Sequence, residues 1–185
     1  MAKNSANIRI GECEIWQTAY SAPGSGINGG TLLGHTQGGV KFSVDRKFTD
    51  LTVDQYGSMP LDMALTGVDL TIEATFAEVT TPYIAIATPE GRYDSTASDQ
   101  KLGIGRDSGF LLSTTAKQYV FHPRNLPSSN QDEDIYIFKA VSIDKVELDY
   151  TIDGQRLLKV TWRALVDETQ PDGSRLGRIG NNLIS

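Results

Sequence analysis

The sequence has little of what would cross-link, anchor or strongly charge a protein. It contains one cysteine, Cys13, among 185 residues, so no disulfide can form within the chain. We interpret Cys13 as a small apolar residue in a reduced compartment rather than as a reactive thiol. No segment approaches the roughly 18 consecutive apolar residues of a membrane helix. Met1–Ser5 shows no apolar signal region either. These absences predict a protein made in the cytosol, without a membrane partner.

Basic residues are nowhere concentrated. The chain has 17 Lys and Arg against 23 Asp and Glu, for a formal net charge of −6. The first eighty residues hold nine acids and five bases, and the remainder hold fourteen and twelve. A groove that grips nucleic acid needs clustered Lys and Arg to replace phosphate counterions, so this distribution argues against one. The length fits a single domain, which at this size buries roughly 70% of the surface that its unfolded chain exposes. Such a domain needs no disulfide or metal ion to hold its core together.

Signatures of catalysis and metal binding are also scarce. Gly24–Gly29 has the spacing of a dinucleotide-binding loop, but Pro23 precedes it and no helix follows, so we interpret it as an ordinary loop. His35 and His122 stand alone, which favours structural or solvent-facing roles. Asp132–Asp134 lacks the glycine and distal glutamate of a calcium loop and is interpreted as a solvated turn. The serines have no nucleophile-elbow context. We predict no catalytic residue, no cofactor and no metal.

What the sequence does contain is a period of two. Within Val68–Phe76, apolar residues alternate with polar ones, and the same holds for Leu158–Val166. Because successive side chains of a strand point to opposite faces, each segment has one packed and one wet face. We expect further strands over Arg9–Thr18, Val40–Val44, Phe48–Tyr56, Phe110–Phe121, Ile135–Val141 and Lys145–Thr151. The fold is therefore predicted to be mainly β.

The remaining segments are predicted to be turns, loops and one short helix. Asp153-Gly154 suits a hairpin turn between Lys145–Thr151 and the strand at Leu158. Thr81-Pro82 can begin a helix of one or two turns that continues to Ala87. Long polar loops are expected at Ser21–Gly30, Glu90–Gly109 and Asp167–Ser185. Long loops in a compact domain usually have a task, and assembly contacts are one such task.

An ordered set of motifs resembles the phage tail tube (major tail) protein family, most closely that of long-tailed, non-contractile phages. The first block comprises Gly38-Gly39-Val40, Thr49–Gln55, Gly57–Asp62, Gly67 and the strand Val68–Thr81, in that order up to Pro82. The second comprises Asp134–Val141, Leu158–Leu165 and the closing Arg175–Gly180. Ser21–Gly30 and Glu90–Gly109 match no part of the family pattern.

The resemblance implies a single tail tube domain over residues 1–185. Its expected fold is a two-sheet β-sandwich or partial barrel with one short helix. Six copies would form a ring whose inner sheets join into a continuous barrel, and the rings would stack into a tube that conducts viral DNA without binding it specifically. The implied partners are further copies of the chain, a tape measure protein and tail-end proteins. The implied location is the virion tail, assembled in the host cytoplasm.

We assign hypothetical roles to two groups of residues on this basis. The channel lining is predicted to be acidic and hydroxyl-bearing, so that DNA phosphates are touched only weakly. It comprises Thr52, Asp54, Asp69, Thr71, Glu73 and Thr75. The predicted loop 57–67 carries apolar residues that would contact the adjacent subunit, namely Met59, Leu61, Met63 and Leu65. Residues 1–7 and 167–185 are expected to be arms that touch the next ring.

Two alternatives stay open. The first is a related tube or tail-completion component of a contractile tail or secretion system. The second is a monomeric β-sandwich that binds carbohydrate through exposed aromatic side chains. Trp16 and Trp162 are the only tryptophans, and Trp162 falls on an apolar face where core packing explains it better.

Overall fold

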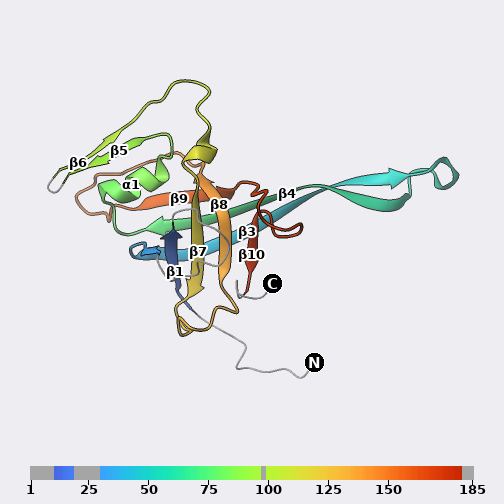
Figure 1. Ribbon diagram of the computed structural model, residues 1–185, viewed down its shortest axis with the longest axis horizontal. Helices are drawn as coiled ribbons and strands as arrows, with labels where there is room; N and C mark the ends of the chain where they lie inside the picture. Colours follow the sequence, from blue (N-terminus) through green and yellow to red (C-terminus); the bar gives the residue numbers. More distant parts are fainter. Residues whose placement is uncertain (1–10, 19–29, 97–98, 181–185) are drawn as a thin grey trace.

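The chain is mainly β, as the alternation predicts. The computed structural model describes residues 11–18, 30–96 and 99–180 (Figure 1). Its elements are β1 (Cys13–Thr18), β2 (Thr31–Leu32), β3 (Thr36–Thr52), β4 (Pro60–Phe76), α1 (Thr81–Ala87), β5 (Arg92–Ser95), β6 (Gln100–Gly103), β7 (Lys117–Pro123), β8 (Ile135–Ser142), β9 (Leu158–Ala164) and β10 (Gly177–Ile179). Short 3-10 turns lie at Asp54–Tyr56 and Leu112–Thr114.

Eight strands form one antiparallel sheet, in the order β2-β1-β7-β8-β9-β4-β3, with β10 added to β8. A second, small sheet contains only β5 and β6. On one side of β8, Ile135–Ile137 pairs with β10, whereas Ala140–Ser142 pairs with β9. β8 and β9 pair over only three residues of each strand. This short pairing lets the sheet turn sharply between them. In Figure 1, β7 and β8 run across the direction of β9 and β4. The arrangement is sandwich-like, built by one sheet bending over itself.

Trp162 of β9 lies at the centre of the core and is fully buried. Phe121 and Tyr119 of β7 contact its indole, with ring centroids 6.0 and 5.0 Å away. Phe76 of β4 meets it edge-on at 5.9 Å. Tyr83 of α1 stacks on Phe76 at 5.5 Å, which attaches the helix to the same cluster. Side chains from non-adjacent strands meet here because the sheet is bent, and the placement of Trp162 confirms its predicted packing role.

The predicted alternation is confirmed over Leu70–Phe76 and Leu158–Ala164, whereas Val68 and Val166, which were predicted to lie on the same packed faces, are exposed. Along β4, every second residue from Leu70 to Phe76 is buried, and the residues between them are partly exposed. Along β9, Leu158, Val160 and Trp162 are buried while Lys159 and Arg163 are exposed. Each strand thus presents one face to the core and one face to water.

The hairpin of β3 and β4 is longer than predicted. Val40–Val44 and Phe48–Tyr56 were expected as two strands, but residues 36–52 form one continuous strand. The expected loop 57–67 is mostly strand, since β4 begins at Pro60. The physical reason is visible in the alternation of Met59, Leu61, Met63 and Leu65, which follows the strand period through the segment. Figure 1 shows the outer half of this hairpin extending well beyond the body.

Lys145–Thr151 is not a strand, and Asp153-Gly154 does not close a hairpin. The segment from 143 to 157 contains no strand. Val146 and Leu148 do pack against the core, so the apolar alternation has a structural cause. β9 pairs with β8 only over Trp162–Ala164, so the edge of Leu158–Val160 that faces away from β4 carries no strand in the described residues. An edge is therefore present, and Lys145–Thr151 nevertheless does not pair with it.

The segment from Asp167 to Gly180 is not an extended arm. β10 pairs with β8 in register Arg178↔Tyr136, and the Gly180 amide donates to the Asp134 carbonyl oxygen at 2.8 Å. Gly177 permits this approach, because a Cβ there would lie 2.5 Å from the Tyr136 carbonyl oxygen. The closing segment therefore belongs to the sheet. The predicted arm at residues 1–7, the Gly24–Gly29 loop and residues 181–185 lie outside the described residues.

Other boundaries shift for local reasons. α1 is confirmed, but Thr80 rather than Thr81 holds the capping position, in extended backbone and without a side-chain cap hydrogen bond. The predicted strand Phe110–Phe121 is replaced at its start by a 3-10 turn, and β7 begins at Lys117. The polar segment Glu90–Gly109 contains the β5–β6 hairpin.

Candidate assembly surfaces

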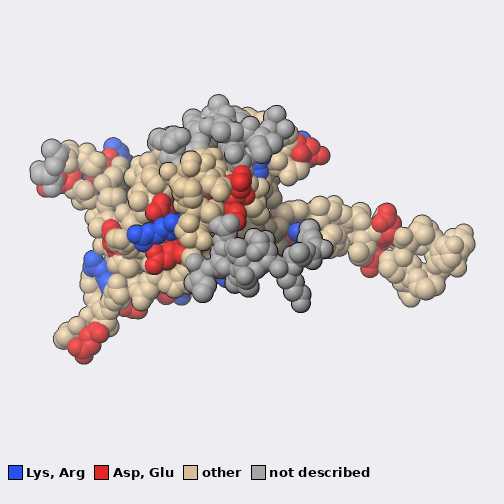
Figure 2. All heavy atoms as spheres, turned by 90° about the horizontal axis from the view of Figure 1, so that it is seen from below, with Lys and Arg blue, Asp and Glu red and all other residues tan. Residues whose placement is uncertain are grey.

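The outer part of the β3–β4 hairpin, residues 48–66, is an exposed arm with an apolar row. The row consists of Phe48, Met59, Leu61, Met63 and Leu65, whose exposed fractions run from 54% to 64%. Phe48 is directly opposite Leu65, and Asp50 is directly opposite Met63, so Phe48, Met63 and Leu65 share one face of the ribbon. A second register shift makes Leu61 an extra residue in β4, and Met59 lies just before that strand. Figure 2 shows the arm as largely uncharged surface with red patches. The residues predicted to contact an adjacent subunit are thus gathered on a projecting, uncovered surface.

A β-bulge keeps Met63 and Leu65 on the core side of the hairpin. Lys47 pairs with Gly67, but the next residue, Phe48, pairs with Leu65, which leaves Thr66 as an extra residue in β4. With a strict period of two, Leu65 would point to the opposite face from Leu70. The bulge corrects the parity, so Leu65 and Met63 continue the core-facing side of β4 beyond the body. This surface is apolar like the core, but its side chains are exposed.

β3 also has a free edge. It pairs with β4 alone, and within the described residues its other side carries no strand. A long edge strand presents unpaired N–H and C=O groups that favour pairing with another chain. This edge was not recognised from the sequence, because edge position depends on strand order rather than on residue type.

The outer face of β4 and β9 forms a polar face with nearly balanced charge. The Arg163 guanidinium binds Asp69 in two places, with Nε 2.8 Å from Oδ1 and Nη2 2.7 Å from Oδ2. Lys159 Nζ lies 3.7 Å from a carboxylate oxygen of both Glu73 and Asp144. The Thr161 hydroxyl donates to Asp144 at 2.9 Å. These exposed pairs contribute ~0–1 kcal/mol each to stability, so their main effect is to neutralise the face.

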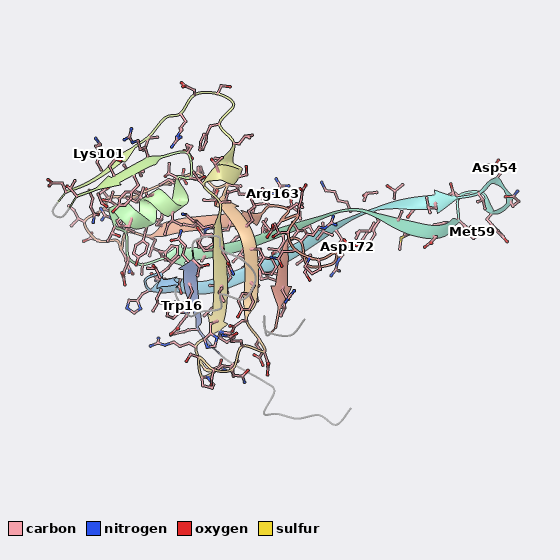
Figure 3. All side chains as sticks on the ribbon, viewed as in Figure 1. Trp16, Asp54, Met59, Lys101, Arg163 and Asp172 are labelled. Atoms are coloured by element: carbon pink, nitrogen blue, oxygen red, sulfur yellow. The ribbon has the colours of Figure 1, made fainter. Side chains whose placement is uncertain are left out.

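Only four of the six residues predicted to line a channel lie together. Asp69, Thr71, Glu73 and Thr75 follow one another on the polar face. Thr52 pairs with Pro60 near the end of the arm, and by alternation along β3 it faces the side opposite to Asp45 and Asp69. Asp54 lies at the tip of the arm, far from Arg163 on the body (Figure 3). A single wall can therefore include the first four residues but not Thr52 and Asp54.

His122 and Asp134 form a buried pair that the sequence did not predict. His122 Nδ1 is 2.6 Å from Asp134 Oδ1, and the two side chains are 3% and 0% exposed. His122 Nε2 is 3.2 Å from the Leu126 carbonyl oxygen. Both ring nitrogens of His122 therefore lie within hydrogen-bond distance of an oxygen atom. The Tyr136 hydroxyl donates to Asp134 Oδ2 at 3.3 Å.

This pair corrects the interpretation of Asp132–Asp134 as a solvated turn. Asp132 and Glu133 are exposed, but Asp134 is completely buried. Its partners come from β7, from the loop that follows β7, and from β8. The carboxylate thus holds together the ends of two neighbouring strands, which is a structural role. A signal for this was present in the position of Asp134 directly before an apolar strand.

Cys13 has the environment of a packing residue. It contacts the main hydrophobic cluster, and its thiol donates to the Glu14 carbonyl oxygen at 3.5 Å. Burial, reinforced by the carboxylates of Asp134 and Glu14, raises the pKa of the Cys13 thiol to about 12. The thiolate is the nucleophilic form, so this shift opposes reactivity. His35, in contrast, is exposed and lies 3.7 Å from Glu78, which agrees with a solvent-facing role.

Two further searches of the described residues bear on the site. No group of three or more His, Cys, Asp and Glu side chains in that part of the chain is arranged to hold a metal ion. No helix there has the length and apolar character needed to cross a membrane.

Comparison with known proteins adds no family assignment. Neither a scan of protein-family models nor a search of curated proteins finds a match to this chain. The surfaces described above are therefore the basis for a functional proposal, together with the order of the sequence motifs.

Proposed function

We propose that the chain is a structural subunit that assembles with copies of itself into rings and then into a hollow tube of the phage tail type. The observation that carries the proposal is the apolar row on the projecting arm. Fully burying a Leu, Met or Phe side chain contributes about 1.5–3 kcal/mol, and each side chain of the row is still more than half exposed. A partner that covers the row would recover several kcal/mol. Exposed apolar surfaces of this extent mark protein–protein contacts.

The free edge of β3 supports ring formation. Strands of adjacent copies can pair along such an edge, and a ring closes all edges if the rotation between copies returns to the start. The tail tube resemblance implies six copies, whose inner sheets would then join into one continuous barrel. The same resemblance implies contacts with a tape measure protein and with tail-end proteins, and assembly in the host cytoplasm into the virion tail.

The polar face of β4 and β9 suits a channel wall. Its acids are Asp45, Asp69, Glu73 and Asp144, and its bases are Lys41, Lys47, Lys159 and Arg163, which gives 4 − 4 = 0. Unpaired lysines or arginines would hold duplex DNA, which carries about one negative charge per ~1.7 Å of its axis. A neutralised, hydroxyl-bearing face would instead let DNA slide. The wall we propose contains Asp69, Thr71, Glu73 and Thr75, and no longer Thr52 or Asp54.

Negative-stain microscopy of the purified chain tests the proposed function. We expect rings or open-ended hollow tubes without any added partner. Tubes that require a sheath protein would favour the contractile-tail alternative. A monodisperse monomer at every concentration and salt condition would reject assembly. The carbohydrate-binding alternative gains no support, because Trp162 is buried and Trp16 packs against Val120, Tyr136 and Phe138.

The channel wall is tested by size-selective labelling of assembled tubes. In a Cys13→Ser background, we expect Thr71→Cys to react with a small maleimide but not with a maleimide attached to a large polymer, because the channel excludes the polymer. Asp107→Cys, on an exposed loop, is the matched control and should react with both reagents. Equal labelling of Thr71→Cys by both reagents would show that the polar face lies outside the channel.

A further inference from the structure

The body has an apolar groove on the side away from the arm. A cavity of about 520 Å³ opens between α1 and the adjoining ends of β1, β7 and β8. Apolar and aromatic side chains provide much of its lining, among them Leu33, Pro82, Tyr83, Ile86 and Val141. Concave, mostly apolar sites of this size with a few polar groups are typical binding sites.

The polar groups of this groove are incompletely satisfied. Ser142 lines the groove and is only 4% exposed, yet its hydroxyl has no hydrogen-bond partner in the described part of the chain. Lys117 is the one charged residue of the described lining, and no ion pair joins it to another described residue. A buried hydroxyl without a partner and a lone ammonium group both favour an incoming ligand that carries acceptors.

The arm has the complementary properties. Between Phe48 and Thr66 it carries Asp50, Asp54 and Asp62 but no Lys or Arg. It also carries the apolar row, whose side chains are uncovered. An apolar surface with acidic neighbours matches an apolar groove with a lysine at its lining, and electrostatic complementarity of this kind selects one partner over others.

Other cavities fit the arm less well. One of about 400 Å³ is lined by Glu12, Glu14 and Glu78 against the single guanidinium of Arg124, so its net negative charge would repel the aspartates of the arm. Another, of about 160 Å³, lies between β10 and the base of the β3–β4 hairpin. It is smaller, and it is bounded by the strands from which the arm itself extends. A cavity of about 340 Å³ is formed by the loop 149–156 alone, and one of about 280 Å³ has no apolar side chain in its lining. The groove beside α1 is the better receptor.

An arm cannot reach the groove of its own chain. In Figure 1, the arm extends from one side of the body, whereas α1, β5 and β6 lie on the other. The contact must therefore join different copies. Because the donor surface and the receptor surface are different patches at opposite ends, the contact is head-to-tail and repeats from copy to copy.

We infer that the arm of one copy docks in the α1 groove of a second copy, with the apolar row in the groove and the aspartates of the arm near Lys117. This inference rests on the proposed self-assembly, and it adds the identity of the receiving surface. Ser142 would then receive an acceptor from the incoming strand, and Lys117 would gain a carboxylate partner.

Disulfide trapping tests the contact directly, because a disulfide forms only where two Cα atoms approach within about 7 Å. Two single-cysteine chains are mixed in a Cys13→Ser background, one with Leu61→Cys and the other with Tyr93→Cys, a groove-lining residue. Tyr150→Cys is the matched control, since Tyr150 is exposed and lies outside the groove. We expect Leu61→Cys to cross-link with Tyr93→Cys at least about tenfold faster than with Tyr150→Cys, owing to the high effective concentration in a docked pair.

A second pair of variants guards against disturbance by the cysteines. Lys117→Glu should abolish the preference for Tyr93→Cys, and Lys117→Arg should retain it. Equal rates with Tyr93→Cys and Tyr150→Cys, or no cross-link, would overturn the groove contact. Microscopy of the same samples separates the two proposals. If tubes form without the preferred cross-link, the contact between arm and groove is rejected but assembly into tubes is retained. If only monomers form and no preferred cross-link appears, both proposals are rejected.

Discussion

A chain carrying Leu61→Asp and Leu65→Asp is expected to remain a folded monomer under conditions in which the unaltered chain forms tubes. Both leucines are exposed, at 64% and 55%, and neither belongs to the core. Substitutions at such positions usually change stability by no more than about 0.5 kcal/mol. In the assembled state, however, two carboxylates would have to enter a contact that excludes water, at an effective penalty of several kcal/mol per ion. The expected outcome is a complete loss of tubes with an unchanged unfolding transition.

Thr49→Asp provides the matched control for Leu65→Asp alone. Thr49 lies on the same arm but pairs with Ala64, on the face opposite to Phe48 and Leu65. The two variants add the same charge at neighbouring levels of the ribbon. Microscopy and sedimentation should show assembly for Thr49→Asp and its loss for Leu65→Asp. Normal tubes from the double leucine variant, or equal loss from Thr49→Asp, would show that the apolar row is not the contact.

His122→Leu is expected to lower the free energy of unfolding by about 3 kcal/mol, because a buried polar group that loses its hydrogen-bond partner keeps its full desolvation cost. The side chain of Asp134 would stay buried but would lose its 2.6 Å contact with the imidazole ring. Its remaining side-chain donor, the Tyr136 hydroxyl, lies farther away, at 3.3 Å. Denaturation in urea, followed by circular dichroism, measures the loss. A total stability of 5–15 kcal/mol is normal for a domain, so this change would be large.

The exposed pair of Asp69 and Arg163 is the natural control for this experiment. Its side chains are 30% and 50% exposed, so Arg163→Ala should cost less than about 1 kcal/mol. A chain with both His122→Leu and Asp134→Leu should regain part of the stability lost by His122→Leu alone, because the Asp134 carboxyl group no longer stays buried without its partner. A cost for His122→Leu no larger than that for Arg163→Ala would refute the importance of the buried pair.

The sequence predicted which side chains of a segment face the core better than it predicted which segments pair as strands. The alternation within Val68–Phe76 identified one packed face, of which Leu70, Ile72, Ala74 and Phe76 are buried and Val68 is exposed. The alternation within Lys145–Thr151 was equally regular, yet no strand forms there. Both segments contain apolar side chains that reach the core. They differ in their partners, since Val68–Phe76 pairs with β3 and β9 whereas Lys145–Thr151 pairs with no strand, and the local alternation does not distinguish the two outcomes.

The candidate site shows the same division. The residues Met59, Leu61, Met63 and Leu65 could be named from their apolar character within a polar segment, but their expected loop is a strand of an extended arm. Thr52 and Asp69 were grouped because both alternate with apolar residues. The arm separates them, and strand alternation puts them on opposite sides of the ribbon. The encounter of His122 with Asp134 depends on the ends of β7 and β8 being adjacent.

The alternating strands and the short helix after Phe76 were determined by the sequence alone. Side-chain period and capping preferences act between residues that are close in the chain, so a local pattern suffices to predict them. Strand order, the free edge of β3, the bulge at Thr66 and the seating of β10 on β8 were decided only by the tertiary structure. These features depend on which edges remain unpaired once the core has formed, and no local pattern carries that information. The arm combines both kinds of feature, because its apolar residues could be identified from the sequence whereas its projection from the body could not be predicted.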